Sequence, residues 1–318
     1  RSLPARAAFL PLLMTPQAWY IFSYYNSDAL ALFLTTVTTY QLADDQSLLH
    51  RFFNNKLNTA NAWKAILLLG GLAGMLLLIK KNFYFFLIAA FCCFLTGFFF
   101  QRYRFSWALG KKALALAAIA LSLLGLRYGA DVWVNGWNKS AQIREIQEER
   151  ADYIYKPSTP LNEKHPQLHI RARGTGLQEF LETYRWGGKI IRSFYGVYGY
   201  MTVSAGTPYY TLMSISGFLF LGFLFLTVLV RGSGEERLLL LNITLCTLGL
   251  IAAACYTSWT KDLQGQGRYL LVVLPMLGLL VARTRHLLQP LLFHAFFAFM
   301  FLMSLYSFIF VGLSSPLL

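Results

Sequence analysis

Long runs of apolar residues constrain the fold of this chain more than any other feature of its sequence. One run extends from Leu238 to Thr260 without a charged residue. Because a helix needs about 20 apolar residues to cross the hydrocarbon layer of a bilayer, such runs predict transmembrane helices. Only 13% of all residues are charged, whereas soluble domains contain about 25%. The sequence therefore predicts an all-α integral membrane protein.

Nine runs are candidates for transmembrane helices, and eight or ten spans are the alternatives. Pro11 and Pro16 interrupt the first run, and the second run is short. Membrane helices tolerate such prolines where neighbouring helices satisfy the freed backbone groups. The nine candidate spans lie at about 5–21, 28–42, 62–79, 82–100, 112–130, 209–230, 237–256, 264–282 and 290–313.

The basic residues between the runs predict the orientation of the chain. Lys and Arg near the span ends gather mainly on one face, which the positive-inside rule assigns to the cytoplasm. Segment 131–208 then lies outside the cytoplasm and is expected to be mainly helical, between N-terminal helices in 1–130 (about five) and C-terminal helices in 209–318 (about four). These loops also account for the formal charge of +14, so no binding of nucleic acid is expected.

The cysteines and the N-terminus give weaker indications. The four cysteines lie in apolar runs without CxxC or Cys/His spacing, so they are predicted to be buried thiols, and no metal site is predicted from them. The chain begins with Arg1 and shows no signal-peptide pattern, from which we expect a processed or truncated N-terminus. The cysteines are Cys92, Cys93, Cys246 and Cys255.

The stretch KDLQGQGRYLLVVLPM, residues 261–276, is unusually polar for the beginning of a membrane span. Counting back from Arg283 places Gln266, Gly267 and Arg268 at the outer edge of the membrane. Glycines free the backbone for close approach or positive φ, and an arginine binds phosphate oxygens through two parallel hydrogen bonds. The pattern favours a site for a lipid phosphate, and a snorkelling arginine that ends a span is the alternative.

Three further features fall on the same face. Lys80 and Lys81 form an outer turn against the positive-inside rule, and either an anionic headgroup or a carboxylate of the long loop could compensate them. Asp28 at the entrance of a span could orient a metal or an acceptor hydroxyl, or could belong to a helix N-cap. Aromatic residues could frame the entry of a sugar or lipid, or form an interfacial belt. These aromatic residues are Tyr195, Tyr198 and Tyr200 of SFYGVYGY, together with Tyr269.

Several of these motifs resemble one bacterial family. GQGRYLLVVLP resembles the QGRYLLPVLP signature of an uncharacterised family of polytopic membrane proteins, which is itself similar to GT-C-type glycosyltransferases. SFYGVYGY is similar to its SFWGxFGW motif, NSDALALFLTTVTTYQL to NDALxxLLxxLxLY, and LLLGGLAGMLLLIKKNFYFF to GxLLGLALLTKxNY. The resemblance extends from about residue 5 to 313. Val272 replaces a proline of the signature, and no acidic outer loop precedes the first span.

The resemblance implies a GT-C-like fold in the bacterial inner membrane and a set of site residues. It implies Arg268, with Lys80 and Lys81, as contacts of a lipid phosphate, and Gln266 and Gly267 are placed with them. It implies Asp28 as an acidic residue of the active site. No cofactor is assigned, and a divalent cation stays open, because one Asp does not make a cation site.

The sequence predicts a membrane glycosyltransferase. It would move a sugar from a polyprenyl-phosphate donor to a cell-envelope glycan or lipid acceptor outside the cytoplasm, with membrane lipids around it. The alternatives are a non-catalytic scaffold in envelope polysaccharide assembly and a transporter of lipid-linked glycans. Ionisable residues inside spans mark transport paths, and apart from His294 the span interiors contain almost none.

Overall fold

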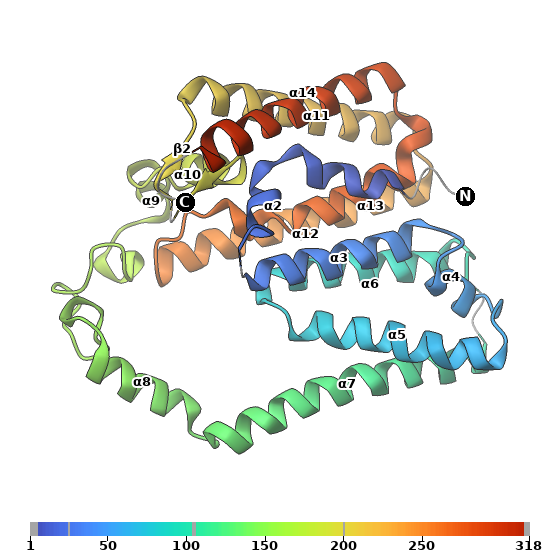
Figure 1. The fold of residues 1–318 in the computed structure, drawn as a ribbon, viewed down its shortest axis with the longest axis horizontal. Coiled ribbons are helices and arrows are strands. Elements are labelled where there is room, and N and C mark those ends of the chain that lie inside the picture. Colours follow the sequence, from blue (N-terminus) through green and yellow to red (C-terminus); the bar gives the residue numbers. More distant parts are fainter. Residues whose placement is uncertain (1–5, 25, 104–105, 200, 315–318) are drawn as a thin grey trace.

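The computed structural model describes residues 6–24, 26–103, 106–199 and 201–314, and it is almost entirely helical (Figure 1). The longer helices run side by side, and successive ones alternate in direction. The N-terminal part contains η1 (Ala7–Met14), α2 (Pro16–Ile21), α3 (Ser27–Ala43), α4 (Leu48–Phe53), α5 (Thr59–Leu78), η2 (Lys81–Phe83), α6 (Tyr84–Phe99) and α7 (Trp107–Asn135).

A segment of shorter elements follows at one end of the bundle. It contains α8 (Lys139–Arg150), η3 (Tyr153–Tyr155), η4 (Ile170–Arg173), α9 (Leu177–Thr183), α10 (Trp186–Phe194) and the antiparallel strands β1 (Val197–Tyr198) and β2 (Val203–Ser204). We call this end of the bundle the outer end and the opposite end the inner end.

The chain then returns to long helices. These are α11 (Thr207–Arg231), α12 (Gly234–Thr260), η5 (Gly267–Leu270), α13 (Val273–Thr284), η6 (Arg285–Leu287), α14 (Pro290–Tyr306) and the π-helical turn η7 (Ser307–Leu313).

Seven helical segments of the described chain are long and apolar enough to cross a membrane, which confirms an all-α membrane protein at this level. The predicted spans at 5–21 and 28–42 are not among them. Pro16 starts a new helix in the first, and α3 has 17 residues, so the count of nine stays a prediction. The seven segments are Thr59–Leu78, Lys81–Phe99, Trp107–Asn135, Thr207–Arg231, Gly234–Thr260, Gly267–Leu287 and Pro290–Leu313.

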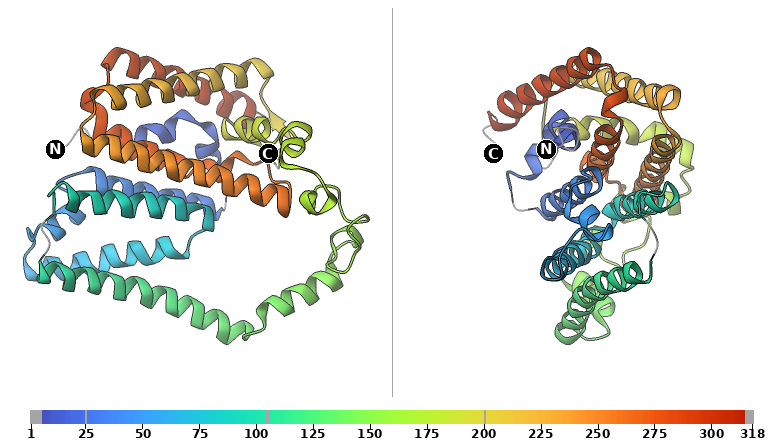
Figure 2. Two further views of the ribbon diagram at one scale, coloured as in Figure 1. Left: turned by 180° about the vertical axis from the view of Figure 1, so that it is seen from behind. Right: turned by 90° about the vertical axis from the view of Figure 1, so that its right-hand side faces the viewer.

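The core lies where α3 and α6 face α12 and α13, with α11 and α14 on one side and α5 and α7 on the other (Figure 2). The most enclosed of the seven segments is Gly267–Leu287, which is consistent with its central position. Segment α7 is the least enclosed. It packs on Gly70 and Gly74 of α5, where an added Cβ would come within 2.8 Å of Ile119 or Leu123. Beyond that contact α7 diverges from the bundle and continues to Asn135, past the predicted boundary at residue 130.

Candidate functional site at the outer end

Asp28 and Lys80 form an ion pair at the outer end. Asn26 is the N-cap of α3, and its side chain accepts the N–H of Asp28 at 2.9 Å. Asp28 therefore lies in the first turn of α3, and the N-cap residue, which was the alternative for Asp28, is Asn26. Its carboxylate is 1% exposed and lies 2.9 Å from the Lys80 ammonium. The partner of Lys80 thus comes from α3, whereas the sequence suggested a headgroup or the long loop.

Arg268 lies in the short helix η5, which interrupts the entry to α13. Its guanidinium covers the Tyr269 ring at 5.5 Å from the centroid, and it interacts electrostatically with Asp28. Its Nε and the neighbouring Gln266 Oε1 are both buried. Among the described residues, Nε has no hydrogen-bond acceptor and Oε1 has no hydrogen-bond donor. Buried polar atoms usually have a partner, so this turn holds unused hydrogen-bonding capacity.

The glycines of the same motif serve close packing. An added Cβ at Gly267 would overlap the backbone nitrogen of Phe194, and one at Gly265 would come within 2.9 Å of the Lys189 side chain. Neither glycine has a positive φ. Gly267 is buried against α10, so the structure explains it by the close approach of two backbones, and its contact with a phosphate stays a prediction.

A pocket of about 430 Å³ lies between the η2–α6 turn and the outer end of α12. Lys80 and Lys81 line it together with Tyr269, whose hydroxyl donates to Gln264 Oε1. Its remaining lining residues are polar Asn82, Thr257, Ser258 and Gln264 and apolar Phe85, Leu250, Ala253 and Ala254. The structure thus brings Lys80, Lys81 and Tyr269 together, whereas Arg268, Asp28, Gln266 and Gly267 lie outside this lining.

The pocket residues from α12 were missed by the sequence analysis. Thr257 and Ser258 belong to an apolar run. Isolated Ser and Thr residues are common in such runs, because their hydroxyls can bond to the backbone carbonyls of their own helix, so neither residue indicated a site. Ser258 instead donates to the carbonyl of Gln264 at 3.2 Å. The only local signal was the position of both residues, six and seven residues before the QGQGRY stretch.

Two of the predicted aromatic residues, Tyr195 and Tyr198, are part of the core. Tyr198 has no exposed surface, and its hydroxyl shares a hydrogen bond of 2.9 Å with Ser307 Oγ. Tyr195 is 8% exposed and lines an apolar groove of about 270 Å³ between α10, α11 and α12. These two tyrosines are therefore neither an exposed sugar platform nor an interfacial belt. Tyr200 lies outside the described residues.

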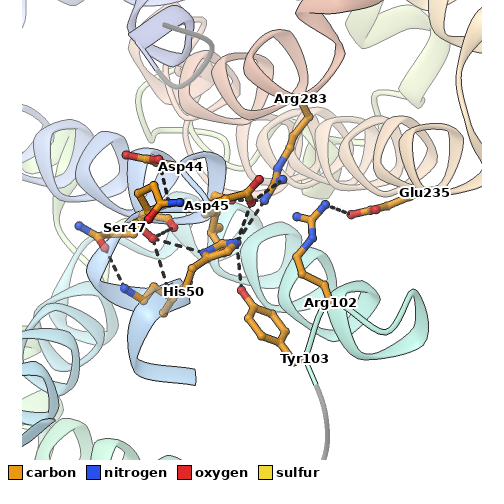
Figure 3. A network of polar contacts seen from close by, with 12 residues as sticks. Asp44, Asp45, Ser47, His50, Arg102, Tyr103, Glu235 and Arg283 are labelled. Carbon is orange, nitrogen blue, oxygen red and sulfur yellow. Dashed lines mark hydrogen bonds and ion pairs between the residues drawn. The ribbon is translucent and has the colours of Figure 1, made fainter. Parts of the chain in front are cut away.

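A second polar cluster occupies the inner end, and the sequence analysis missed it (Figure 3). His50 of α4 is 2% exposed and lies within 3.4 Å of Ser47, Tyr103, Asp45 and Arg283. Burial, reinforced by the positive charge of Arg283, lowers the pKa of His50 to about 4. Arg283 also pairs with Asp45 at 3.2 Å.

Among the described residues, no group of three or more His, Cys, Asp or Glu side chains is placed to hold a metal ion. The Asp28 carboxylate is paired with the Lys80 ammonium. The four cysteines are free thiols: Cys92, Cys93, Cys246 and Cys255. No family model, curated protein or solved structure matches this chain. The resemblance carried by the QGRYLL stretch therefore stays a prediction.

Proposed function

We propose that this chain is a bacterial membrane glycosyltransferase. It takes a sugar from a polyprenyl-phosphate donor and transfers it to an envelope glycan or lipid on the outer side of the cytoplasmic membrane. The observation that carries the proposal is the pocket beside Lys80 and Lys81, which joins two cations to an apolar floor at the outer end of the bundle.

The lining of this pocket matches the two parts of such a donor. The ammonium groups of Lys80 and Lys81 and the amides of Asn82 and Gln264 can donate to phosphate oxygens. Hydrogen bonds between ionised partners are about twice as strong as neutral ones. Below them, the apolar floor that includes Phe85 suits the first isoprene units of the lipid, since apolar surface gains by leaving water.

The ion pair between Asp28 and Lys80 suggests how the reaction would proceed. A phosphate in the pocket competes with Asp28 for the Lys80 ammonium, and its arrival leaves the carboxylate free to accept a proton. Asp28 is buried behind Lys80 and outside the pocket lining, so the Lys80 side chain has to turn towards the phosphate to open a path to the carboxylate. The acceptor hydroxyl then attacks C1 of the sugar and gives its proton to Asp28. The bond between C1 and the phosphate oxygen breaks, and the leaving polyprenyl phosphate keeps the electron pair beside Lys81 and Arg268.

Binding is the first test, with the full chain in lipid nanodiscs. C55 polyprenyl phosphate should displace a fluorescent polyprenyl phosphate, and the uncharged C55 polyprenol should not. Lys81→Ala should weaken this binding by at least about tenfold, since a hydrogen bond to a charged group contributes about 1.5–3 kcal/mol. Lys261→Ala is the matched control, because Lys261 is exposed at the same end and outside the pocket. Equal loss in both variants would remove the pocket from the proposal.

Transfer is the second test. Nanodiscs supplied with C55 polyprenyl phosphate-linked glucose, mannose or arabinose and an envelope lipid extract should release free polyprenyl phosphate, and Asp28→Asn should abolish the release. Tight binding with no release for any sugar would favour a scaffold or a transporter, and vesicle translocation of the donor would identify the latter.

A further inference from the structure

Helices α6 and α12 pack together, and a cavity lies towards each end of their contact. Between the two cavities, Asn242 Nδ2 donates to the carbonyl of Ala89 at 2.8 Å. Nearer the outer cavity, an added Cβ at Gly249 would lie 2.9 Å from the ring of Phe85 in the first turn of α6. The pocket of about 430 Å³ lies towards the outer end. A second pocket of about 200 Å³ lies towards the inner end, between Cys93 and Thr96 of α6 and the first turns of α12.

An ion pair connects two residues that line the inner pocket. Arg102, from the connection between α6 and α7, lies 2.7 Å from the Glu235 carboxylate in the first turn of α12. The two side chains are 26% and 29% exposed, so they reach water. At the same end Arg283 joins α13 to Asp45 after α3 (Figure 3). Both ion pairs connect the N-terminal helices to the C-terminal helices.

The nature of these contacts decides how the two sets of helices can move. A well-packed apolar contact resists separation, because the exposed surface must be hydrated. A partly exposed ion pair holds much less strongly, since water replaces each lost partner. The ion pair of Arg102 and Glu235 can therefore break and reform beside the inner pocket, while the hydrogen bond between Asn242 and Ala89 and the buried Leu239 keep α12 packed in the bundle.

We propose that α12 rocks on α6 about the contact between Asn242 and Ala89, and that the ion pair of Arg102 and Glu235 is the latch of the inner pocket. In the structure the latch is closed and the larger cavity is at the outer end. A rotation that narrows the outer pocket widens the inner one, as in hinged closure of packed elements. Such a motion would change the width of the outer pocket, but the test below does not depend on the reaction proposed above.

Cys93 lines the inner pocket and reports directly on this motion. In the full chain with Cys92, Cys246 and Cys255 replaced by alanine, Cys93 is the single thiol, and its rate of reaction with a polar maleimide in nanodiscs measures the opening of the pocket. Arg102→Glu and Glu235→Arg should each raise this rate roughly fivefold, the factor that corresponds to about 1 kcal/mol for a surface ion pair. The double variant Arg102→Glu/Glu235→Arg restores the pair and should return the rate to that of the parent.

Arg237→Glu is the matched control. Arg237 is exposed in the same turn of α12, and the described residues give it no ion-pair partner. Its variant should react at the parent rate. Unchanged rates in both single variants, or a double variant as reactive as the singles, would overturn the latch.

Salt gives a second measurement that needs no substitution. Raising NaCl from 0.05 to 1 M shortens the screening length to about 3 Å and should accelerate the parent but not Arg102→Glu. An equal salt response in both proteins would also overturn the proposal.

Discussion

The Lys80 ammonium lies 2.9 Å from Asp28 Oδ1, yet the Asp28 side chain is 1% exposed and that of Lys80 is 37% exposed. Loss of the ion pair therefore has different consequences for the two side chains. Without Asp28, Lys80 can turn to water. Without Lys80, a carboxylate stays buried with one cation fewer, and a buried charge that loses its partner is strongly destabilising.

Lys80→Met should therefore destabilise the protein more than Asp28→Asn does. We expect the free energy of unfolding to fall by about 2–3 kcal/mol in Lys80→Met and by about 1 kcal/mol in Asp28→Asn. Thermal unfolding in detergent, followed by tryptophan fluorescence, measures both. The double variant should lose less than the sum of the two, and equal losses in the single variants would contradict the asymmetry.

Gly267→Ala should be poorly tolerated even though alanine is the better helix former. Its Cβ would overlap the Phe194 backbone nitrogen, and backbone atoms cannot turn aside as a side chain can. We expect a loss of about 2–3 kcal/mol, in the range of overpacked cores. Gly187→Ala in α10 is the control, since nothing lies within 4 Å of its added Cβ, and it should gain up to about 1 kcal/mol in the same unfolding assay.

The membrane helices could be predicted from the sequence because their signal is local. A run of apolar residues is long enough to span or it is not, and seven of the predicted spans correspond to helices that are long and apolar enough to cross a membrane. Counting spans also placed Asp28, Lys80 and Arg268 at one end, where the structure has them. The limit of this reasoning is visible at Pro16 and α3, where a run is apolar but broken or short.

The contacts between helices could not be predicted, because they join residues far apart in the chain. Nothing in the turn around Lys80 indicates that Asp28 is its partner, and nothing around Glu235 indicates Arg102. The tyrosine at 198 shows the same limit, since an aromatic residue beside glycines suits a membrane interface and a buried core equally well. Its burial depends on η7, which is over a hundred residues away.

Tyr198→Phe separates the two interpretations of this aromatic cluster. The change removes the hydrogen bond to Ser307 and leaves the ring in place. The free energy of unfolding should fall by about 1–2 kcal/mol, because the Ser307 hydroxyl is left buried without this partner. Binding of C55 polyprenyl phosphate should stay unchanged, as the ring has no exposed surface. A stable variant with weakened binding would instead restore a role in ligand recognition.

The buried imidazole of His50 should make the protein less stable in mild acid. Its folded-state pKa of about 4 lies below the value of about 6.5 that an unfolded chain gives. Above pH 6.5 the imidazole is neutral in both states, and its contribution to stability is constant. As the pH falls towards 4, the unfolded state binds a proton that the folded state refuses, so about 3 kcal/mol is lost across this window.

A series of unfolding temperatures from pH 7.5 to pH 4 tests this expectation. The quantity to compare is the slope with pH, because His50→Gln also removes the contacts with Ser47 and Tyr103 and lowers stability at every pH. The slope between pH 6.5 and 4 should become shallower in His50→Gln. If the slope of His50→Gln matches that of the parent, the acid sensitivity belongs to other groups, and His50 is not held neutral by its burial beside Arg283.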